Sequence, residues 1–340
     1  MGLRMRKSIK LGPGVRLNVS HKSVGLRVGG RGAGVTVNSS GRHSASVGIP
    51  GSGVGYSTRL GGSGGSRARA AAIAPSPPPK PGLMASGTEK AFYKAIAAVA
   101  AGQHQEALRL FRASNAKDSK DKALADDFFV GLLSAQLAED EAAIAALEKV
   151  VDSDRALPDT LMEKYLDGGG TVLAITEHVA VQVPFGSACA ALVLAEVYQR
   201  NGRLEEAIGV VQQLVDVHPH PYLVLSLCDL LAAAGAYDEL VLVAAGVSNQ
   251  DDVSCQIRIL QADALAKQGM RDAALEAYKD ALRSKKREPG LLKDARYARA
   301  LLHLDSGKKA LARKELEKLY AEDPRYRDVA DRLRALTPDR

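Results

Sequence analysis

The chain has 340 residues, of which 46% are hydrophobic and 25% are charged, so it is long enough for about two globular domains. No apolar run reaches the ~18 residues that a membrane-spanning helix needs, and the three cysteines are too few and too scattered for a disulfide framework. The basic start of the chain is not followed by an apolar segment. The sequence therefore predicts no secretory signal and favours a cytoplasmic protein.

The net charge of +7 is divided unevenly along the chain. Residues 1–88 hold thirteen Lys and Arg and no acid, whereas residues 89–340 hold 33 bases and 39 acids, which gives +13 and −6. Between the two parts lies the run Pro77-Pro78-Pro79, which favours a semi-rigid extended spacer. We therefore expect a basic, Gly-rich part at residues 1–60, a Gly/Pro linker at 61–87 and a separate part at 88–340.

Short β-branched runs separated by turn residues predict a small all-β module in the basic part. The expected strands are Val15–Ser20, Val24–Val28, Gly34–Asn38, Ser44–Val47 and Val54–Leu60. Glycine-rich segments between them supply the left-handed conformations that tight turns need. A sheet of about 55 residues with small side chains buries little apolar area, so alone it should be marginally stable.

Three motifs occur in order in this part of the chain. They are Arg6-Lys-Ser-Ile-Lys-Leu-Gly-Pro-Gly-Val-Arg-Leu-Asn-Val-Ser20, Gly29-Gly-Arg-Gly-Ala33 and Val47-Gly-Ile-Pro-Gly-Ser-Gly-Val-Gly-Tyr56. Over residues 3–59 the chain resembles the small bacterial and phage domain of unknown function 4236. The resemblance implies a compact β module, usually N-terminal, to which no chemistry is assigned.

Nine bases of the module are candidates for anion binding. They are Arg4, Arg6, Lys7, Lys10, Arg16, Lys22, Arg27, Arg31 and Arg42. Uncompensated positive charge attracts phosphate, but proteins that bind single strands stack bases on aromatic side chains, and Tyr56 is the only aromatic residue here. Three interpretations stay open: binding of an anionic polymer such as nucleic acid, solvation of a glycine-rich sheet, or self-association through sheet edges.

From residue 88 on, one spacing pattern recurs six times, with starts at about 88, 124, 188, 221, 255 and 293. A small residue is followed seven positions later by glycine, then by alanine and by a bulky residue. The small residues are Ala95, Gly131, Ala195, Cys228, Ala262 and Ala300, and the turn residues are Gly102, Ala138, Gly202, Gly235, Gly269 and Gly307. The bulky residues are Phe111, Leu147, Val211, Tyr278 and Leu316, weakened to Ala244 in the fourth copy. This spacing predicts helix-turn-helix pairs that cross closely at the small residues.

The pattern resembles the tetratricopeptide repeat (TPR) family over residues 88–324, although the tryptophan of the family's first helix is absent from every copy. The resemblance implies an all-α solenoid of about six repeats, with a capping helix near Arg325–Leu336. An insertion at about 156–187 should hold a short helix at Pro158–Asp167 and a β-hairpin built from Val172–Thr176 and Val179–Val183. The expected fold class is therefore α+β and multidomain.

The resemblance also implies a partner-binding groove lined by the second, fifth, ninth, twelfth and thirteenth positions of the repeats. The groove candidates are Glu196, Gln199, Arg200, Asp229, Asp263, Lys267 and Tyr297. The family's carboxylate-binding groove has Asn at the ninth position, where three successive repeats here have an acid, so a cationic ligand is favoured. One such ligand, with Arg67, Arg69 and Lys80, is tethered to the same chain. The alternative is that the acids only solvate the groove.

The sequence predicts no catalytic constellation, no cofactor and no metal site. His218 and His220 are close together, but they lie in a loop with no cysteine nearby. Cys228 stands at a small core position, and Cys189 and Cys255 have no local signature of a reactive thiol. We therefore expect a non-enzymatic adaptor that binds a protein partner of unknown identity; the alternatives are a nucleic-acid-associated protein and a self-assembling one.

Overall fold

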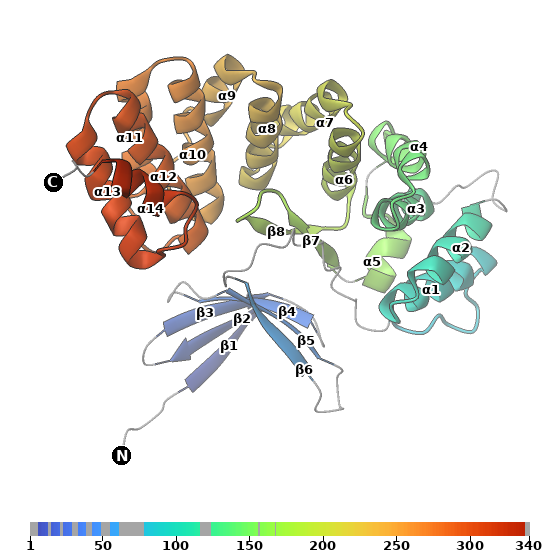
Figure 1. Cartoon of the computed structure of the whole chain (residues 1–340). Helices are drawn as coiled ribbons and strands as arrows, with labels where there is room; N and C mark the ends of the chain where they lie inside the picture. Colours follow the sequence, from blue (N-terminus) through green and yellow to red (C-terminus); the bar gives the residue numbers. More distant parts are fainter. Residues whose placement is uncertain are drawn as a thin grey trace. The chain divides into compact units, whose positions relative to one another are not determined.

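The computed structural model describes residues 6–12, 15–20, 23–28, 33–38, 43–48, 55–60, 78–115, 124–155, 157–166 and 168–336 (Figure 1). Two units make up the chain. The N-terminal unit comprises Met1–Ala174 and Ala180–Val211, and the C-terminal unit comprises Ile175–Val179 and Gln212–Arg340. Within the described ranges, no helix is both long enough and apolar enough to cross a membrane.

Six strands pair antiparallel in chain order in the basic part. They are β1 (Arg6–Gly12), β2 (Val15–Ser20), β3 (Ser23–Val28), β4 (Ala33–Asn38), β5 (His43–Gly48) and β6 (Gly55–Leu60). Strand β1 was not among the expected strands, because three bases interrupt its apolar pattern. Its register with β2 shifts between Lys10 and Gly12. The compact all-β module stays a prediction, since the turns that would close it lie outside the described residues.

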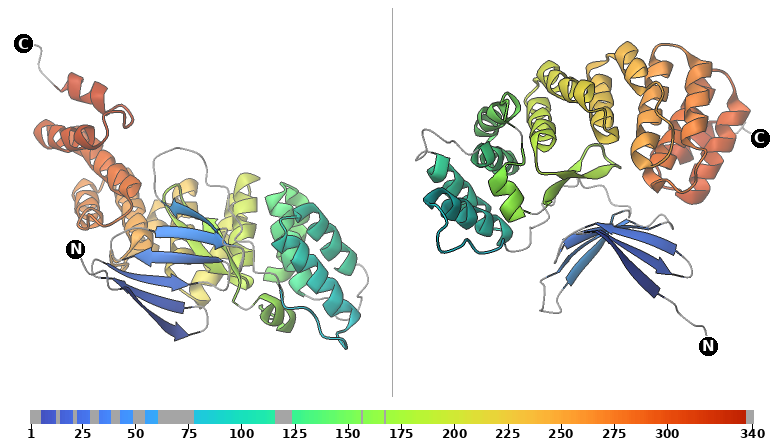
Figure 2. Two further views of the ribbon diagram at one scale, coloured as in Figure 1. Left: turned by 90° about the horizontal axis from the view of Figure 1, so that it is seen from below. Right: turned by 180° about the vertical axis from the view of Figure 1, so that it is seen from behind.

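Six helix pairs follow in the described part of the chain, one for each expected repeat (Figure 2). The first three are α1 (Gly87–Ala100) with α2 (His104–Asn115), α3 (Leu124–Gln136) with α4 (Asp140–Val151), and α6 (Ser187–Arg200) with α7 (Leu204–Val217). The last three are α8 (Pro221–Ala234) with α9 (Tyr237–Ala244), α10 (Asp252–Lys267) with α11 (Arg271–Ala281), and α12 (Pro289–Asp305) with α13 (Lys309–Glu322).

The turn inside each pair needs one residue in the left-handed region, and the predicted residue takes it each time. The φ angles are 73°, 77°, 71°, 79° and 71° at Gly102, Gly202, Gly235, Gly269 and Gly307. In the second pair Ala138 adopts φ 62°, although its Cβ makes this conformation unfavourable. The predicted turn positions are therefore confirmed, including the one without glycine.

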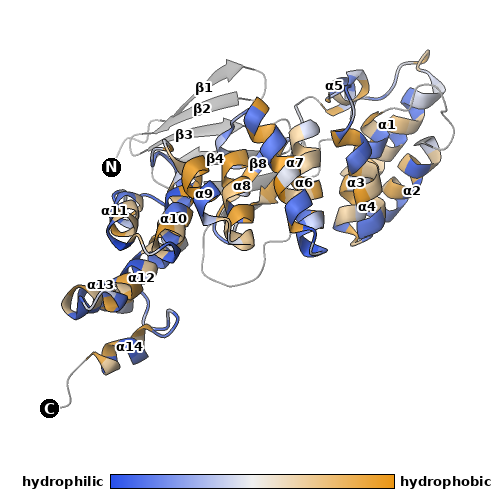
Figure 3. Ribbon diagram, turned by 90° about the horizontal axis from the view of Figure 1, so that it is seen from above, coloured by the Kyte–Doolittle hydropathy of each residue, from blue (hydrophilic) through white to orange (hydrophobic). Residues whose placement is uncertain are grey.

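The small and bulky positions of the repeats form the core. At most 2% of the surface is exposed at the small residues Ala95, Ala195, Cys228, Ala262 and Ala300, and at the bulky residues Phe111, Leu147, Val211, Tyr278 and Leu316. At Gly131 a Cβ atom would lie 2.4 Å from Cγ of Leu147, so α3 and α4 can approach this closely only because residue 131 is glycine. Helix α8 is apolar along most of its length, since it packs against both α9 and α10 (Figure 3).

The insertion contains the expected short helix and hairpin. Helix α5 spans Thr160–Leu166, and its first turn is capped by the Asp159 side chain, which accepts hydrogen bonds from two backbone amides. Strand β7 (Gly170–Ala174) pairs antiparallel with β8 (Ala180–Pro184). The first strand begins two residues earlier than predicted, because Gly170 pairs with Pro184.

The last helix, α14 (Val329–Ala335), covers the end of the sixth pair. It begins later than the predicted Arg325, because residues 324–328 form turns. Val329 is fully buried in a cluster with Tyr297, Ala300, Leu316 and Leu319. The helix therefore protects an apolar face of α12 and α13 from water, as a terminal cap must do in a solenoid.

Candidate partner-binding groove

In the N-terminal unit, α6 carries three of the predicted groove residues. Glu196 and Gln199 are exposed. Surrounding protein atoms displace water from the carboxyl of Glu196 and raise its pKa, while the charge of Arg200 opposes that shift. Glu196 therefore faces a less solvated environment than an ordinary surface acid.

Arg200 is engaged by the preceding repeat. Its guanidinium donates to both carboxylate oxygens of Asp140 on α4, with Nε 2.9 Å from Oδ2, and Nη2 also donates to the carbonyl of Ala135 at 3.2 Å. These bonds hold the pKa of Asp140 below its usual range. Arg200 thus links two repeats, and its charge is already neutralised by Asp140.

In the C-terminal unit, Asp229 on α8 is half-buried. Burial raises the pKa of its carboxyl to about 6. Within the part of the chain that the structure describes, no hydrogen bond or ion pair reaches this side chain. A carboxyl that has lost part of its hydration without gaining a donor is suited to bind a cation, because part of the desolvation has already taken place.

Asp263 on α10 is also half-buried, but it has a partner. The hydroxyl of Tyr278 on α11 donates to its Oδ1 atom. Burial raises the pKa of Asp263, the charge of Asp294 raises it further, and Tyr278, Lys267 and Arg327 oppose the shift. Lys267 is exposed one turn along the same helix. This carboxyl is therefore oriented by tyrosine and lies near both an acid and two cations.

Asp294, which lies on α12 at the second position of the sixth repeat, was not among the predicted groove residues. It accepts hydrogen bonds from the hydroxyl of Tyr326, from Nη2 of Arg327 at 2.6 Å and from the imidazole of His178 at 2.8 Å. Burial raises the pKa of Asp294, but the bonds from His178 and Tyr326 outweigh it, and the pKa lies below its usual value. Its repeat position was the signal that could have identified it.

Tyr297 does not line an exposed groove. Only 7% of its surface is exposed, and it packs under α14 in the cluster around Val329. Its hydroxyl donates to Asp328, which also binds Arg332 at 2.9 Å. The fifth position of this repeat is covered because it is the last one, where the capping helix takes the place of a further repeat.

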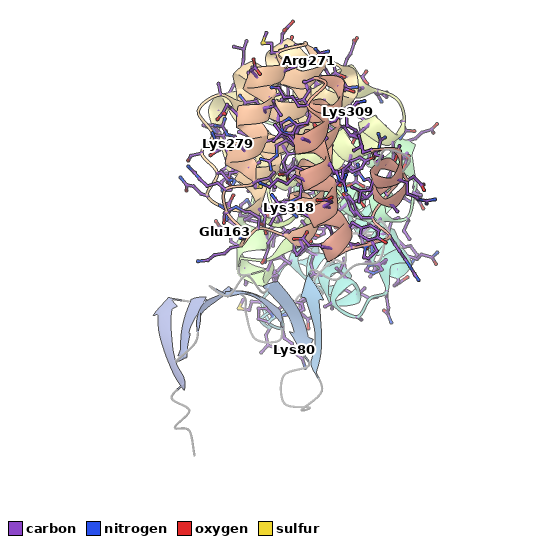
Figure 4. The ribbon with its side chains drawn as sticks, turned by 60° about the vertical axis from the view of Figure 1, so that its left-hand side comes forward. Lys80, Glu163, Arg271, Lys279, Lys309 and Lys318 are labelled. Atoms are coloured by element: carbon purple, nitrogen blue, oxygen red, sulfur yellow. The ribbon has the colours of Figure 1, made fainter. Side chains whose placement is uncertain are left out.

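The predicted anion-binding bases are only partly placed. Arg6, Lys7 and Lys10 lie on β1, Arg16 on β2 and Arg27 on β3, whereas Arg4, Lys22, Arg31 and Arg42 lie outside the described residues. The backbone register places Lys10 opposite Arg16, and Arg16 opposite Arg27. Of the linker bases, Lys80 is exposed (Figure 4), and Arg67 and Arg69 lie outside the described residues.

The three cysteines are buried, free thiols, and burial raises the pKa of each to about 12. A thiol that stays protonated at neutral pH is a poor nucleophile. His220 precedes α8, and its ring contacts that of Tyr222 in a tilted arrangement with centroids 4.0 Å apart; burial lowers the pKa of His220. In the described ranges, no three His, Cys, Asp or Glu side chains form a group that could hold a metal ion.

Comparison with known families accounts for both parts of the chain. Residues 3–57 match the family described as protein of unknown function DUF4236, and residues 192–239 and 259–327 match the tetratricopeptide repeat family. The chain carries a DUF4236 segment followed by tetratricopeptide repeats. Both resemblances inferred from the sequence are thus confirmed. The TPR match falls on the last four helix pairs, although it leaves out the first residues of α6, most of α9 and the first part of α10. The same spacing extends to the first two pairs.

Solved structures share the fold at low sequence identity. The C-terminal part of a TPR repeat-containing protein from Cytophaga hutchinsonii is 15% identical, with a TM-score of 0.51 over 73% of this chain and 88% of that one. The N-terminal domain of the EccA1 ATPase from the ESX-1 secretion system of Mycobacterium tuberculosis is 12% identical, with a TM-score of 0.50 over 74% and 89%.

A third similar structure, the APC/C hetero-tetramer Cut9–Hcn1, is 17% identical, with a TM-score of 0.39 over 73% of this chain. This chain spans 42% of the length of that protein. No curated protein matches the chain. The family match and the two structures with TM-scores of 0.50 and 0.51 establish the TPR fold; they do not identify a partner.

Proposed function

We propose that the TPR part is a non-enzymatic adaptor that binds a cationic segment of a protein partner through carboxylates of its first helices. The observation that supports this most directly is Asp229, whose pKa is raised to about 6 by burial without any donor or cation from the described residues. Such a group destabilises the fold while it is ionised. Proteins retain destabilising groups of this kind where function requires them.

Asp263 extends the same chemistry to the next repeat of the C-terminal unit. Its Oδ1 atom is oriented by Tyr278, which leaves the second carboxylate oxygen to accept a bond from an ammonium or guanidinium group. In the N-terminal unit, Glu196 occupies the same repeat position and has a raised pKa for the same reason. Carboxylates at one repeated position fit a partner segment in which Lys or Arg recurs.

Each expected part of the chain has its own role in this proposal. Residues 1–60 would dock or localise the protein, residues 61–87 would act as a spacer, and residues 88–340 would bind the partner. The linker itself carries Arg67, Arg69 and Lys80, so an intramolecular ligand is one form that the cationic segment can take. A tether raises the effective concentration of such a segment without any new contact.

The test uses the full chain and a fluorescein-labelled deca-arginine peptide, whose binding is followed by anisotropy at several salt concentrations. The double variant Asp229→Asn/Asp263→Asn removes two charges, keeps side-chain size and leaves one accepting oxygen on each side chain. We expect binding to weaken by about tenfold or more, since a charge pair in a partly desolvated site contributes on the order of 1–3 kcal/mol.

The matched control removes two charges from exposed positions of the same unit. In Asp272→Asn/Glu276→Gln both changes lie on α11, where 98% and 72% of the side-chain surfaces are exposed. This control should bind within about twofold of the original protein, because exposed charges contribute little. An equal loss of peptide affinity in both double variants would show that only net charge matters and would contradict binding at Asp229 and Asp263.

A second candidate function is association with nucleic acid through the DUF4236 segment. The observation that favours it is the row of Lys10, Arg16 and Arg27 opposite one another on three adjacent strands. Like charges in such a row repel unless an anion neutralises them. The full chain should then bind duplex DNA with a log K that falls linearly with log salt, and Arg16→Ser should reduce the slope by about one. A slope unchanged by Arg16→Ser would contradict this candidate.

A further inference from the structure

The tip of the β7–β8 hairpin contacts the start of α12. Residues Ile175–Val179 form the tip, in which the amides of Ile175 and Thr176 donate to the carbonyl of Val179 at 2.9 and 3.2 Å. Nε2 of His178 lies 2.8 Å from Oδ2 of Asp294, and Nδ1 lies 3.6 Å from Oε2 of Glu288. One imidazole, 116 residues away in the sequence from Asp294, thus contacts a carboxylate of α12 and the carboxylate of its N-cap residue.

Gly290 provides the space for this imidazole. A Cβ atom at residue 290 would lie 2.4 Å from Cε1 and 2.5 Å from Nδ1 of His178, and 2.7 Å from Oε2 of Glu288. The residue stands in the first turn of α12, where its φ lies outside the left-handed region. The backbone therefore does not require glycine there, and alanine would favour the helix. What glycine permits is the close approach of the ring.

Carboxylates dominate the surroundings of the imidazole. Asp294 faces it from α12, Glu288 faces it from the N-cap position before that helix, and Glu177 lies beside it on the tip. From the turn before α14, Arg327 and Tyr326 bind Asp294, and Asp263 on α10 interacts electrostatically with Asp294. The bond to Asp294 raises the pKa of His178, the three nearby acids add to this, and burial opposes it. The docked tip therefore favours the imidazolium form.

Asp294 occupies the second position of the sixth repeat, one of the positions expected to line the partner groove. We propose that the hairpin tip is a pH-sensitive strap, which binds Asp294 and Glu288 through His178 and competes there with a cationic side chain of the partner. The competition rests on the proposed adaptor function, whereas docking of the tip does not. The tip would thus act as a ligand that the chain itself supplies.

The sign of the pH dependence follows from linkage. The pKa of His178 is higher in the docked tip than in a free imidazole, whose value is about 6.5. Docking is therefore strongest at pH values below that of the free imidazole, and it weakens as the pH rises through the raised value. At acidic pH the tip should bind Asp294 and Glu288, and at mildly alkaline pH it should dissociate from them.

The first experiment measures docking in the full chain by hydrogen exchange of the 175–179 amides at pH 6 and pH 8, corrected for intrinsic rates. We expect protection at pH 6 that decreases at pH 8, and at both pH values in Gly290→Ala only the lower protection that the hydrogen bonds within the tip provide. The matched control is Gly209→Ala on α7, where a Cβ atom would meet no other atom within 4 Å. Full protection of the tip in Gly290→Ala would overturn the strap.

A second experiment measures the pKa of the His178 imidazole by NMR titration. Its pKa should lie above the ordinary value in the original protein and fall in Asp294→Asn, which keeps side-chain size but removes the charge and the accepting carboxylate that contribute most to the shift. A pKa that is the same in both proteins would contradict the ion pair. Because Asp294→Asn leaves Gly290 in place, this test is independent of the glycine substitution.

The competition is measured with the labelled deca-arginine peptide. Gly290→Ala should bind it at least about threefold more tightly than the original protein at pH 6, and the ratio should approach one at pH 8, where the strap is already released. Protonation of the groove carboxylates changes the affinity of both proteins in the same way. The ratio of the two affinities at one pH therefore reports only the effect of the strap. A ratio of one at both pH values would overturn the competition. Failure of every variant to bind would refute the cationic groove itself, while the exchange data still decide whether the tip docks.

Discussion

Replacing Asp229 with asparagine should stabilise the protein at neutral pH and leave it unchanged in acid. Burial raises the pKa of this carboxyl from 3.8 to about 6. Because the value is higher in the folded state, the ionised form destabilises folding; this effect is absent below about pH 4 and complete above pH 6. A shift of about two units corresponds to roughly 3 kcal/mol. The side chain is only half-buried, so water screens part of this, and we expect about 1–2 kcal/mol.

Urea denaturation of the original protein and of Asp229→Asn at pH 4, 5 and 7.5 measures this difference. Repeat proteins do not always unfold in a single step, so hydrogen exchange of the α8 amides provides a local reading of the same free energy. The control is Asp272→Asn; because the Asp272 carboxylate is 98% exposed, this substitution should change stability by less than about 0.5 kcal/mol at any pH. If Asp229→Asn raised the free energy of unfolding equally at all pH values, or did not raise it at pH 7.5, the reasoning that burial raises this pKa would be refuted.

Three further predictions concern the fold. Ala138→Gly should stabilise the protein by about 0.5–1 kcal/mol because it relieves a left-handed φ of 62°, whereas Ala145→Gly in the exposed middle of α4 should destabilise it by about 1 kcal/mol; thermal unfolding compares them. Gly131→Val should lower stability by roughly 1–3 kcal/mol, since its side chain would overlap Leu147, and Leu147→Ala should partly rescue it. Asn249→Ala should cost about 2–4 kcal/mol in urea titrations, because the buried Asn249 amide donates to two carbonyls at the end of α11 and accepts from Arg287.

Much of the repeat architecture could be predicted from the sequence because it depends on local spacing. A small residue, a turn residue seven positions later and a bulky residue beyond it determine where two helices cross, where the chain reverses and what fills the core. Ala138 shows how strong this spacing is, since it takes the left-handed turn without being glycine. The hairpin of the insertion was predictable for the same reason, because its two strands are close in sequence.

The candidate site was predicted only in part, because its electrostatics depend on residues far apart in the chain. The sequence identified Asp229 and Asp263 as acids at the same repeat position, but it could not show that one has no partner and the other binds Tyr278. It placed Tyr297 in the groove, where the capping helix instead buries it.

The sequence by itself therefore determined the order of the parts, the helix pairs and their turns, since these follow from short-range spacing and backbone conformation. Only the tertiary structure decided which carboxylates are neutralised, which are desolvated and which are bound by the chain itself. The contact between His178 and Asp294 illustrates the reason: it joins residues 116 positions apart, and no local pattern specifies a neighbour at that distance. Burial and ion pairing are properties of the assembled fold, and they determine the chemistry of the groove.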